Sequence, residues 1–565
     1  MASNFFNKAS LVMVPDAPID GKLPSVKPED RSGDFTFSRG SNLAATRVNK
    51  DGLIEKGGEN LLLQSNQFDT TWTNTSSAET SGFEGYDGTN NAWKLEKTGN
   101  GGRLRQTISL SGVNTFSVYA KAGTAKWLRL LFETISDSYY FDLENGVLGS
   151  STSQPVDGNI ESVGNGWYRC SVTGSGTIGA VRIYPADDDL DVTGTSGSIY
   201  IQDAQLEQGL VATEYIETTT ATVQKGILEN LPRIDYSGGA SCPSLLLEPQ
   251  RTNYYTNSEY FSGAGWTIGR GVLTYNDAIS PEGLSNAVKW QVTSDTGAHY
   301  LRQSRTSSDT WSISIFVKKG NYRYVGLRCA ASNAAFDLDT GTFSSGSGYV
   351  EPLDNGWYRI GLTETGNGTF QYYGVYYANS DATERNDATG NEYYHIYGAQ
   401  QELGSYPTSY IPAYGSSVTR SADSGVSDVD SLLTSNATYT WMAEFIVPEI
   451  GNGGGEITFK DAGGLSQLRI YCNQNSMVGL RVDENSQNYY IPVSVGDTAK
   501  CLFQCTNGLV KGFYNGALVK TFTIDTGMDA QKIHLGPPVS APKVKQIALF
   551  GTALTDDECI ALTTI

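Results

Sequence analysis

The chain has 565 residues, which is too long for a single hydrophobic core and predicts roughly three to five domains. Its formal net charge of -20 excludes nucleic acids and anionic membranes as expected partners, because binding phosphates requires clustered lysine and arginine. The N-terminus has no apolar signal-peptide core and no run long enough for membrane insertion. We therefore expect synthesis in a cytoplasm without ordinary export.

Glycine and tyrosine are frequent, at 63 and 33 residues, whereas helical periodicity is weak along the sequence. This composition is typical of short strands joined by tight turns. We predict an all-β fold built from tandem antiparallel β-sandwiches, preceded by an extended N-terminal segment.

Residues 1–58 form that N-terminal segment. Its closely spaced prolines exclude a continuous helix or a central strand: Pro15, Pro18, Pro24 and Pro28. The segment is too short for a core of its own. Because it nevertheless contains Phe35, Phe37 and Ile54, we expect it to dock on another surface rather than form a disordered leader.

Residues 59–222 form the first predicted domain. Strand-like runs bounded by Gly, Asn and Ser lie at 115–120, 127–132, 167–172 and 198–202. Their number and spacing predict an antiparallel sandwich of jelly-roll size.

Residues 223–253 are predicted to be a connector, because Pro and Gly punctuate both of its ends. The run 245–247 consists of three leucines, which a flexible linker would not expose. We therefore expect this run to be a strand held against a neighbour.

Residues 254–420 repeat the first domain. The sequence Asn-Gly-Trp-Tyr-Arg occurs at 165–169 and again at 355–359, and Ala-Gln-Leu-Glu at 204–207 returns as Ala-Gln-Gln-Glu at 399–402. A period this long is a whole domain rather than a solenoid repeat. Trp167 and Trp357 follow an Asn-Gly turn within strand-like runs, so we interpret both as core residues.

Residues 425–565 have a different pattern and form the last predicted domain. Tyr514-Asn515-Gly516 lies between apolar strands and predicts a hairpin. The most helix-like stretch is 555–562, where Thr555 and Glu558 have the spacing of a capping box.

No catalytic constellation is evident. Three histidines accompany no nucleophile motif, and the seven cysteines form no metal-ligand pair, so we expect no enzyme activity and mostly buried free thiols such as Cys170. Two carboxylates that hydrolyse a glycan could still occur among 60 acidic residues, and a glycan depolymerase therefore remains an alternative.

The densest acidic cluster lies in one loop of the first domain, at Asp187, Asp188, Asp189 and Asp191. Calcium needs several oxygen ligands on a flexible loop, which makes this cluster the candidate Ca²⁺ site. The alternative is a solvated acidic turn. No other cofactor is expected.

Aromatic side chains on outward strand faces can stack on sugar rings. The candidates in the last domain are Tyr471, Tyr489 and Tyr490. In the second repeat they are Tyr373 and Tyr377, which lie in an alternating aromatic run from 371 to 377. For this run, cross-strand packing is the competing interpretation.

Several short sequence motifs resemble motifs of structural proteins of tailed bacteriophages. They are the runs at 33–39, 45–55, 231–236 and 243–253. The two repeats, with Asn-Gly-Trp-Tyr-Arg and Ala-Gln-Leu-Glu, resemble the carbohydrate-binding-module-like jelly rolls of phage fibres and spikes. The last domain, with 513–516 and 547–558, is similar to concanavalin/laminin-G-like sandwiches.

The resemblance implies a virion fibre protein of the tail or the head, located in the virion after assembly in the cytoplasm of the bacterial host. Residues 1–58 would attach it to other virion proteins, and the sandwiches would bind a host-surface polysaccharide. Such fibres are generally homotrimers. The alternative from another class is a purely architectural protein that decorates the capsid or tail and binds no ligand.

Overall fold

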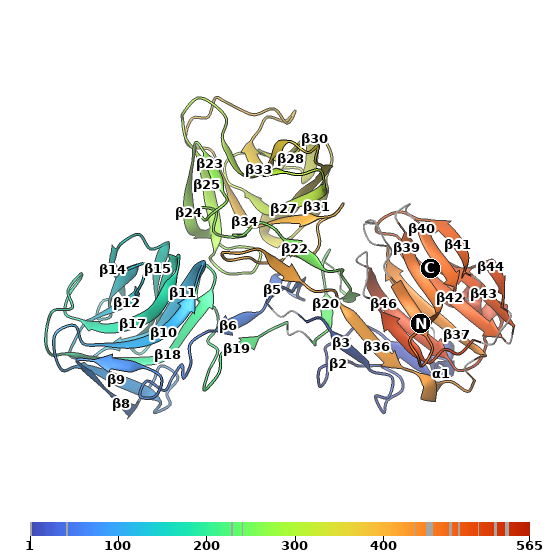
Figure 1. Cartoon of the computed structure of the whole chain (residues 1–565), viewed down its shortest axis with the longest axis horizontal. Coiled ribbons are helices and arrows are strands. Elements are labelled where there is room, and N and C mark those ends of the chain that lie inside the picture. The colour runs from blue at the N-terminus through green and yellow to red at the C-terminus, as the bar shows by residue number, and fades with distance from the viewer. Residues whose placement is uncertain are drawn as a thin grey trace.

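The computed structural model describes residues 3–40, 43–227, 230–239, 241–435, 437–447, 456–473, 477–483, 486–506, 508–524, 528–536 and 542–565. Its strands form antiparallel sheets that build three sandwiches, and Figure 1 shows them as three lobes. The prediction of an all-β fold with tandem sandwiches is confirmed.

Sandwich A consists of two six-stranded sheets that enclose one apolar core. Their strand orders are β14 (Val147–Thr152), β13 (Ser138–Asp142), β12 (Trp127–Phe132), β17 (Ile178–Ala186), β10 (Arg103–Leu110), β7 (Thr73–Thr75); and β15 (Asp157–Gly164), β16 (Trp167–Ser175), β11 (Val113–Ala122), β18 (Ser198–Gln208), β9 (Ala92–Lys97), β8 (Ser77–Phe83).

Sandwich B has the same strand order in both sheets, so the sequence repeat is a repeat of the fold. Its sheets are β30 (Thr342–Ser345), β29 (Ser332–Asp337), β28 (Tyr324–Ala330), β33 (Phe370–Tyr377), β26 (Tyr300–Thr306), β23 (Thr267–Gly269); and β31 (Tyr349–Pro352), β32 (Trp357–Thr365), β27 (Thr310–Lys319), β34 (Tyr393–Leu403), β25 (Ala287–Val292), β24 (Gly271–Ala278). The short 3₁₀ turn η1 (Asp354–Gly356) precedes β32.

The repeated motifs have structural roles. Asn355 and Gly356 both adopt positive φ, at 58° and 76°, and Trp357 after them is 1% exposed. Trp167 in sandwich A is equally buried. The turn is therefore confirmed, since Asn and Gly tolerate the left-handed conformation that it requires. Both tryptophans are buried, but strand alternation places Ile360 and Leu362 in the core of sandwich B and Trp357 on the opposite face, where it packs with Val48 and Ile54.

The glutamine of the Ala-Gln-x-Glu motif fastens the chain that leaves each sandwich. Gln205 Oε1 accepts from Ile216 N at 2.7 Å, and Gln400 Oε1 accepts from Ile411 N at 2.6 Å. All of these groups are buried and have no access to water. The two side-chain hydrogen bonds therefore satisfy backbone N–H groups that would otherwise have no partner.

The C-terminal sandwich consists of two eight-stranded sheets. One contains β20 (Arg233–Asp235), β21 (Ser244–Leu246), β46 (Lys543–Phe550), β37 (Tyr439–Ile446), β42 (Thr498–Thr506), β43 (Leu509–Tyr514) and β44 (Ala517–Thr523), with β1 (Leu11–Met13) also paired to β46. The other, called here the trough sheet, runs β2 (Lys22–Leu23), β3 (Phe35–Ser38), β36 (Ser424–Asp428), β45 (Lys532–Leu535), β38 (Glu456–Lys460), β39 (Ser466–Asn473), β40 (Met477–Val482), β41 (Gln487–Pro492).

This sandwich draws strands from three distant parts of the sequence. Strands β1 to β3 come from the segment 1–58, and β20 and β21 come from the connector 223–253. Docking of Phe35 and Phe37 is confirmed, since they are 0% and 4% exposed in the core. The sandwich boundaries therefore differ from the single range 425–565, because strand pairing brings in segments that sequence order separates. Both chain ends lie in this lobe (Figure 1).

Shorter elements join the lobes. They are the pairs β4 (Thr46–Val48) with β5 (Ile54–Lys56), β6 (Gly58–Asn60) with β19 (Val223–Lys225), and β22 (Arg251–Asn253) with β35 (Val418–Arg420), together with η2 (Asp430–Leu432), α1 (Ser3–Lys8) and α2 (Asp556–Thr563). The capping box of Thr555 and Glu558 at the start of α2 is confirmed. Among the described residues, no helix is long and apolar enough to cross a membrane.

Candidate functional site

The outer face of the trough sheet carries the candidate site. Its strands alternate, so that Ile533 and Leu535 point into the core while His534 between them points outward. Phe35 and Phe37 flank the exposed Thr36 in the same way. Because successive side chains of a strand point to opposite faces, these alternations place polar residues from distant segments next to each other.

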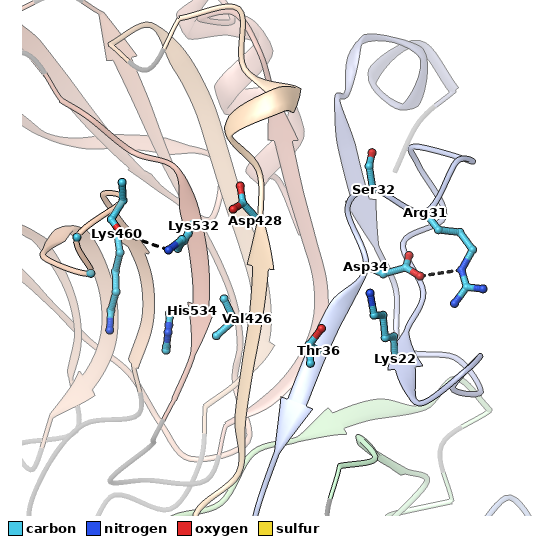
Figure 2. Close-up of a pocket in the computed structure, with 13 residues that line it drawn as sticks. Lys22, Arg31, Ser32, Asp34, Thr36, Val426, Asp428, Lys460, Lys532 and His534 are labelled. Atoms are coloured by element: carbon cyan, nitrogen blue, oxygen red, sulfur yellow. Dashed lines mark hydrogen bonds and ion pairs between the residues drawn. The ribbon is translucent and has the colours of Figure 1, made fainter.

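A polar trough of about 520 Å³ lies across β2, β3, β36, β45 and β38. Figure 2 shows its side chains along the sheet and on the two loops beside it. We call it the cationic trough, and it is lined by Lys22, Arg31, Ser32, Asp34, Thr36, Val426, Asp428, Lys460, Ala462, Gly463, Gly464, Lys532 and His534.

The four positively charged side chains of the trough differ in whether they already form ion pairs or hydrogen bonds. Arg31 pairs with Asp34 and Asp20, each at 2.8 Å, and Lys532 Nζ donates to the carbonyl of Ala462 at 3.2 Å. The ammonium groups of Lys22 and Lys460 form no hydrogen bond or ion pair within the described part of the chain, although the backbones of both residues are hydrogen-bonded. These two ammonium groups are therefore open to an incoming anion.

His534 contributes a neutral ring to the floor of the trough. Burial lowers its pKa below the ordinary value, and the charges of Lys460 and Lys532 act in the same direction. Its Nδ1 lies 3.3 Å from the carbonyl of Gly536, which can only accept, so Nδ1 carries the proton in this contact. The ring can thus offer Nε2 as an acceptor for a hydroxyl group.

Tyr471 and Tyr490 lie on the same outer face as His534, two and four strands along the sheet from it. Tyr471, Gly479 and Tyr490 are directly aligned across β39, β40 and β41, and the two rings are 6.1 Å apart at 87°. Gly479 provides the space, because a Cβ there would meet the Tyr471 ring. Tyr490 is 44% exposed and can stack on a ligand, whereas Tyr489 points the other way and packs partly against the core.

Tyr373 and Tyr377 are misassigned as ligand-binding residues. Both are fully buried in the core of sandwich B, where Tyr373 packs edge-on against Trp311 and Tyr377 packs at a tilt against Tyr322. A ligand at the surface cannot contact these rings. These two side chains of β33 point toward the opposite sheet of sandwich B. The competing interpretation, that the aromatic run serves packing, is therefore the correct one for Tyr373 and Tyr377.

The acidic loop of sandwich A uses its carboxylates to hold itself. Asp187 pairs with Lys97 at 2.5 Å, Asp189 accepts from the backbone and hydroxyl of Ser150, and Asp191 accepts from those of Thr193. Asp188 accepts from Asp189 N. Across the described residues, no group of three His, Cys, Asp or Glu side chains is arranged for a metal, so we interpret the loop as a hydrogen-bonded acidic turn.

Sequence reasoning did not identify Lys22, Lys460 and Lys532 as site residues. The alternation around Thr36 and His534 indicates that these positions face outward. Nothing local, however, indicates that β2 from the N-terminal segment would lie in one sheet with β38 and β45.

Neither a protein-family model nor a curated protein sequence matches the chain. Among solved structures, a CBM40 module of a Ruminococcus gnavus sialidase bound to α2,3-sialyllactose is 16% identical, with 23% of this chain and 83% of that chain covered and a TM-score of 0.20. A tandem CBM22 domain from Paenibacillus barcinonensis is 10% identical over 65% of this chain and 100% of that chain, with a TM-score of 0.19. The NanB sialidase of Streptococcus pneumoniae is 16% identical over 24% and 26%, with a TM-score of 0.20. At these TM-scores the similarity carries no information about a ligand.

Proposed function

We propose that the protein binds acidic glycans through the cationic trough and the rings of Tyr471 and Tyr490, which lie further along the same face of the sheet. The observation that carries this proposal is the local charge. Four Lys or Arg residues and two carboxylates line the trough, in a chain whose net charge is -20. A local excess of positive charge on an acidic protein selects anionic ligands at this place and repels them elsewhere.

The shape and chemistry of the trough suit a saccharide. It is an open, shallow channel on a sheet, with the hydroxyls of Thr36 and Ser32 beside the cations. Tyr490 adds a ring that can stack on the C–H face of a sugar. Lys22 and Lys460 lie four strands apart in the sheet, about 19 Å at the usual strand spacing, so each would bind a separate carboxylate or sulfate of the glycan.

A glycan array with the full-length protein tests this proposal. We expect binding to uronic-acid, sialylated or sulfated glycans and none to their neutral counterparts. Reversing both open charges, with Lys22→Glu and Lys460→Glu, should abolish the signal. Lys520→Glu is the matched control, because Lys520 is exposed on the other sheet of the same sandwich. Equal binding of neutral glycans would contradict the proposal.

We also propose that the protein belongs to a bacteriophage virion, as a tail or head fibre that is homotrimeric, non-enzymatic and attached through its N-terminal segment. This part is supported by the short sequence motifs at 33–39, 45–55 and 243–253. Since strands β1, β2 and β3 of this segment are paired into the C-terminal sandwich, attachment would use the outward surface of the segment rather than a free arm. Protein mass spectrometry of purified virions and light scattering of the isolated protein test location and trimer formation.

The alternative architectural role predicts a different outcome. A protein that only braces the particle should leave phage adsorption unchanged when added in excess, whereas a glycan-binding fibre should compete. A depolymerase would shorten the polysaccharide during incubation, and we expect its chain length to stay constant.

A further inference from the structure

The hairpin β4–β5 of the N-terminal segment is packed onto sandwich B. Val48 and Ile54 are buried against Trp357 and Tyr397, and the backbone of Ile54 donates to the carbonyl of Pro281 at 2.9 Å. This contact aligns β5 with the loop that precedes β25. Lys56, the last residue of β5, is thereby placed at the buried contact between the N-terminal segment and sandwich B.

The amine of Lys56 is enclosed by acceptors. Its side chain is 14% exposed, and Nζ lies 2.8 Å from Glu282 Oε1 and 3.1 Å from Glu259 Oε1. It also donates to the hydroxyl of Tyr414 at 2.6 Å. A lysine in such surroundings is held in one place instead of sampling many rotamers.

Glu282 also holds a carboxamide with its other oxygen. Asn286 Nδ2 donates to Glu282 Oε2 at 2.6 Å, and Asn286 is 1% exposed. Its Oδ1 is buried and has no hydrogen-bond partner in the described part of the chain. Lys56 and Asn286 line the same small cavity of about 90 Å³. One carboxylate thus bridges an amine and a carboxamide that face a shared space.

We propose that Lys56 and Asn286 become joined by an intramolecular isopeptide bond, with Glu282 as the proton-transferring residue. The neutral amine of Lys56 attacks Cγ of Asn286, and a new C–N bond forms. Glu282 takes the proton from the attacking nitrogen and delivers it to the departing amide nitrogen. The C–N bond of the carboxamide then breaks and one molecule of ammonia leaves, so atoms and electrons balance without an oxidant or cofactor.

The charges around Lys56 determine how much of its amine is neutral, and therefore how fast this reaction can proceed. Burial alone would lower the pKa of Lys56, but Glu259 and Glu282 raise it above its ordinary value, so the ammonium form dominates. Burial raises the pKa of Glu282, which favours its acceptance of a proton. We therefore expect the bond to form slowly after folding, because the fixed geometry offsets the small fraction of neutral amine.

Sandwich A supplies an internal control. Asp87 and Asn91 occupy the positions of Glu282 and Asn286 before the matching strands β9 and β25. There the pair is exposed, the Asn91 Nδ2 to Asp87 Oδ2 distance is 3.5 Å, and Asp87 accepts from Thr89 instead of an amine. Within the described residues, no ion pair joins Asp87 to a lysine, so Asn91 should remain unmodified.

The bond would close a covalent loop from residue 56 to residue 286 around the whole of sandwich A. It would tie the N-terminal segment to sandwich B and remove one positive charge from the interior. Because a crosslink restricts the unfolded chain, it should raise the resistance of this region to unfolding.

Peptide mass spectrometry of the folded full-length protein tests the proposal. We expect a branched tryptic peptide that joins the Lys56 and Asn286 segments, one ammonia lighter than their sum, with no cleavage after Lys56. The peptide containing Asn91 should be linear. Recovery of the Lys56 and Asn286 peptides only in linear form, at full mass, would overturn the proposal.

Two variants test the role of each group. Lys56→Arg keeps the positive charge but removes the nucleophilic amine, and Glu282→Gln keeps the shape but removes the proton acceptor. Circular dichroism should show that both are folded, and both should yield only linear peptides. Crosslinking of Glu282→Gln at the wild-type extent would overturn the role of Glu282. Because the assay of the wild-type protein needs no variant, misfolding of a variant would leave the test decisive.

Discussion

Arg233 and Asp423 form a buried ion pair, although 190 residues separate them in the sequence. Their side chains are 0% and 3% exposed, and Arg233 Nε lies 3.3 Å from Asp423 Oδ1. Asp423 also accepts from Arg39 at 3.1 Å, while Arg233 donates to Glu248 at 2.7 Å. The N-terminal segment, the connector and the strand entering the C-terminal sandwich therefore meet at one ionic cluster.

Removing Asp423 should destabilise this junction. Asp423→Ala leaves Arg233 and Arg39 buried with fewer counter-charges, which typically costs about 3–5 kcal/mol. Thermal denaturation followed by circular dichroism should show a lower Tm for the C-terminal sandwich. As a control, Glu144→Ala breaks an exposed pair with Lys126 and should cost less than about 1 kcal/mol. Equal effects of the two variants would contradict the structural role of the cluster.

The N-terminal segment should behave as part of the C-terminal sandwich. Phe35→Ala removes a fully buried ring from its core and should lower the free energy of unfolding by about 3–5 kcal/mol. Val26→Ala in the same segment alters a side chain that is 48% exposed and should have a small effect. Urea denaturation monitored by fluorescence measures both. A free attachment arm would tolerate both substitutions alike.

Asp203 should make the stability of sandwich A depend on pH. It has a positive φ of 51° at a bulge, accepts from Tyr86 at 2.9 Å, and burial raises its pKa to about 6. In the unfolded chain its pKa is about 4. The native state therefore holds the proton more tightly, and stability falls as pH rises from about 4 to about 6, by up to about 3 kcal/mol.

Asp203→Asn should remove that pH dependence, because the side chain no longer titrates. Asp203→Gly should remove it as well. Glycine is the residue at the matching bulge of sandwich B, where Gly398 has a φ of 54°. Both variants should have a higher Tm than the wild type at pH 7.5 and a similar Tm at pH 4. If the difference in Tm between the wild type and Asp203→Asn were the same at pH 4 and pH 7.5, the carboxyl group of Asp203 would stay ionised over this range, which would contradict the prediction.

The exposed ring of Tyr490 should contribute to ligand binding without supporting the fold. Tyr490→Ala should weaken glycan binding roughly tenfold, which corresponds to about 1.4 kcal/mol, while Tm changes little because the ring is 44% exposed. Phe370→Ala, at a 61% exposed ring of sandwich B, is the matched control and should leave binding unchanged. Biolayer interferometry on an immobilised acidic glycan compares the three proteins.

The repeat architecture could be predicted from the sequence because its signals are local. Asn355 and Gly356 before Trp357 determine a turn and the start of the strand after it by conformational preference alone. The same holds for Thr555 and Glu558 at the start of α2, and for the hairpin at Asn515 and Gly516, whose φ values are 42° and 84°.

The candidate site could not be predicted because it depends on pairing between distant segments. Lys22 belongs to a strand that pairs with β3, which in turn pairs with β36 some 390 residues later. The aromatic alternation of Tyr373 and Tyr377 likewise left open which sheet face would be covered. Only the opposing sheet of sandwich B decides that these rings are buried.

The central claim is that the cationic trough binds acidic glycans, and isothermal titration of the full-length protein with a polyuronate tests it most directly. We predict saturable binding that weakens as salt rises from about 0.05 M to about 0.5 M, because the Debye length shortens several-fold in that range. Binding should be lost in the Lys22→Glu, Lys460→Glu protein and retained in Lys520→Glu. Binding that persists unchanged in the doubly reversed protein, or equal binding of a neutral polysaccharide, would contradict the claim.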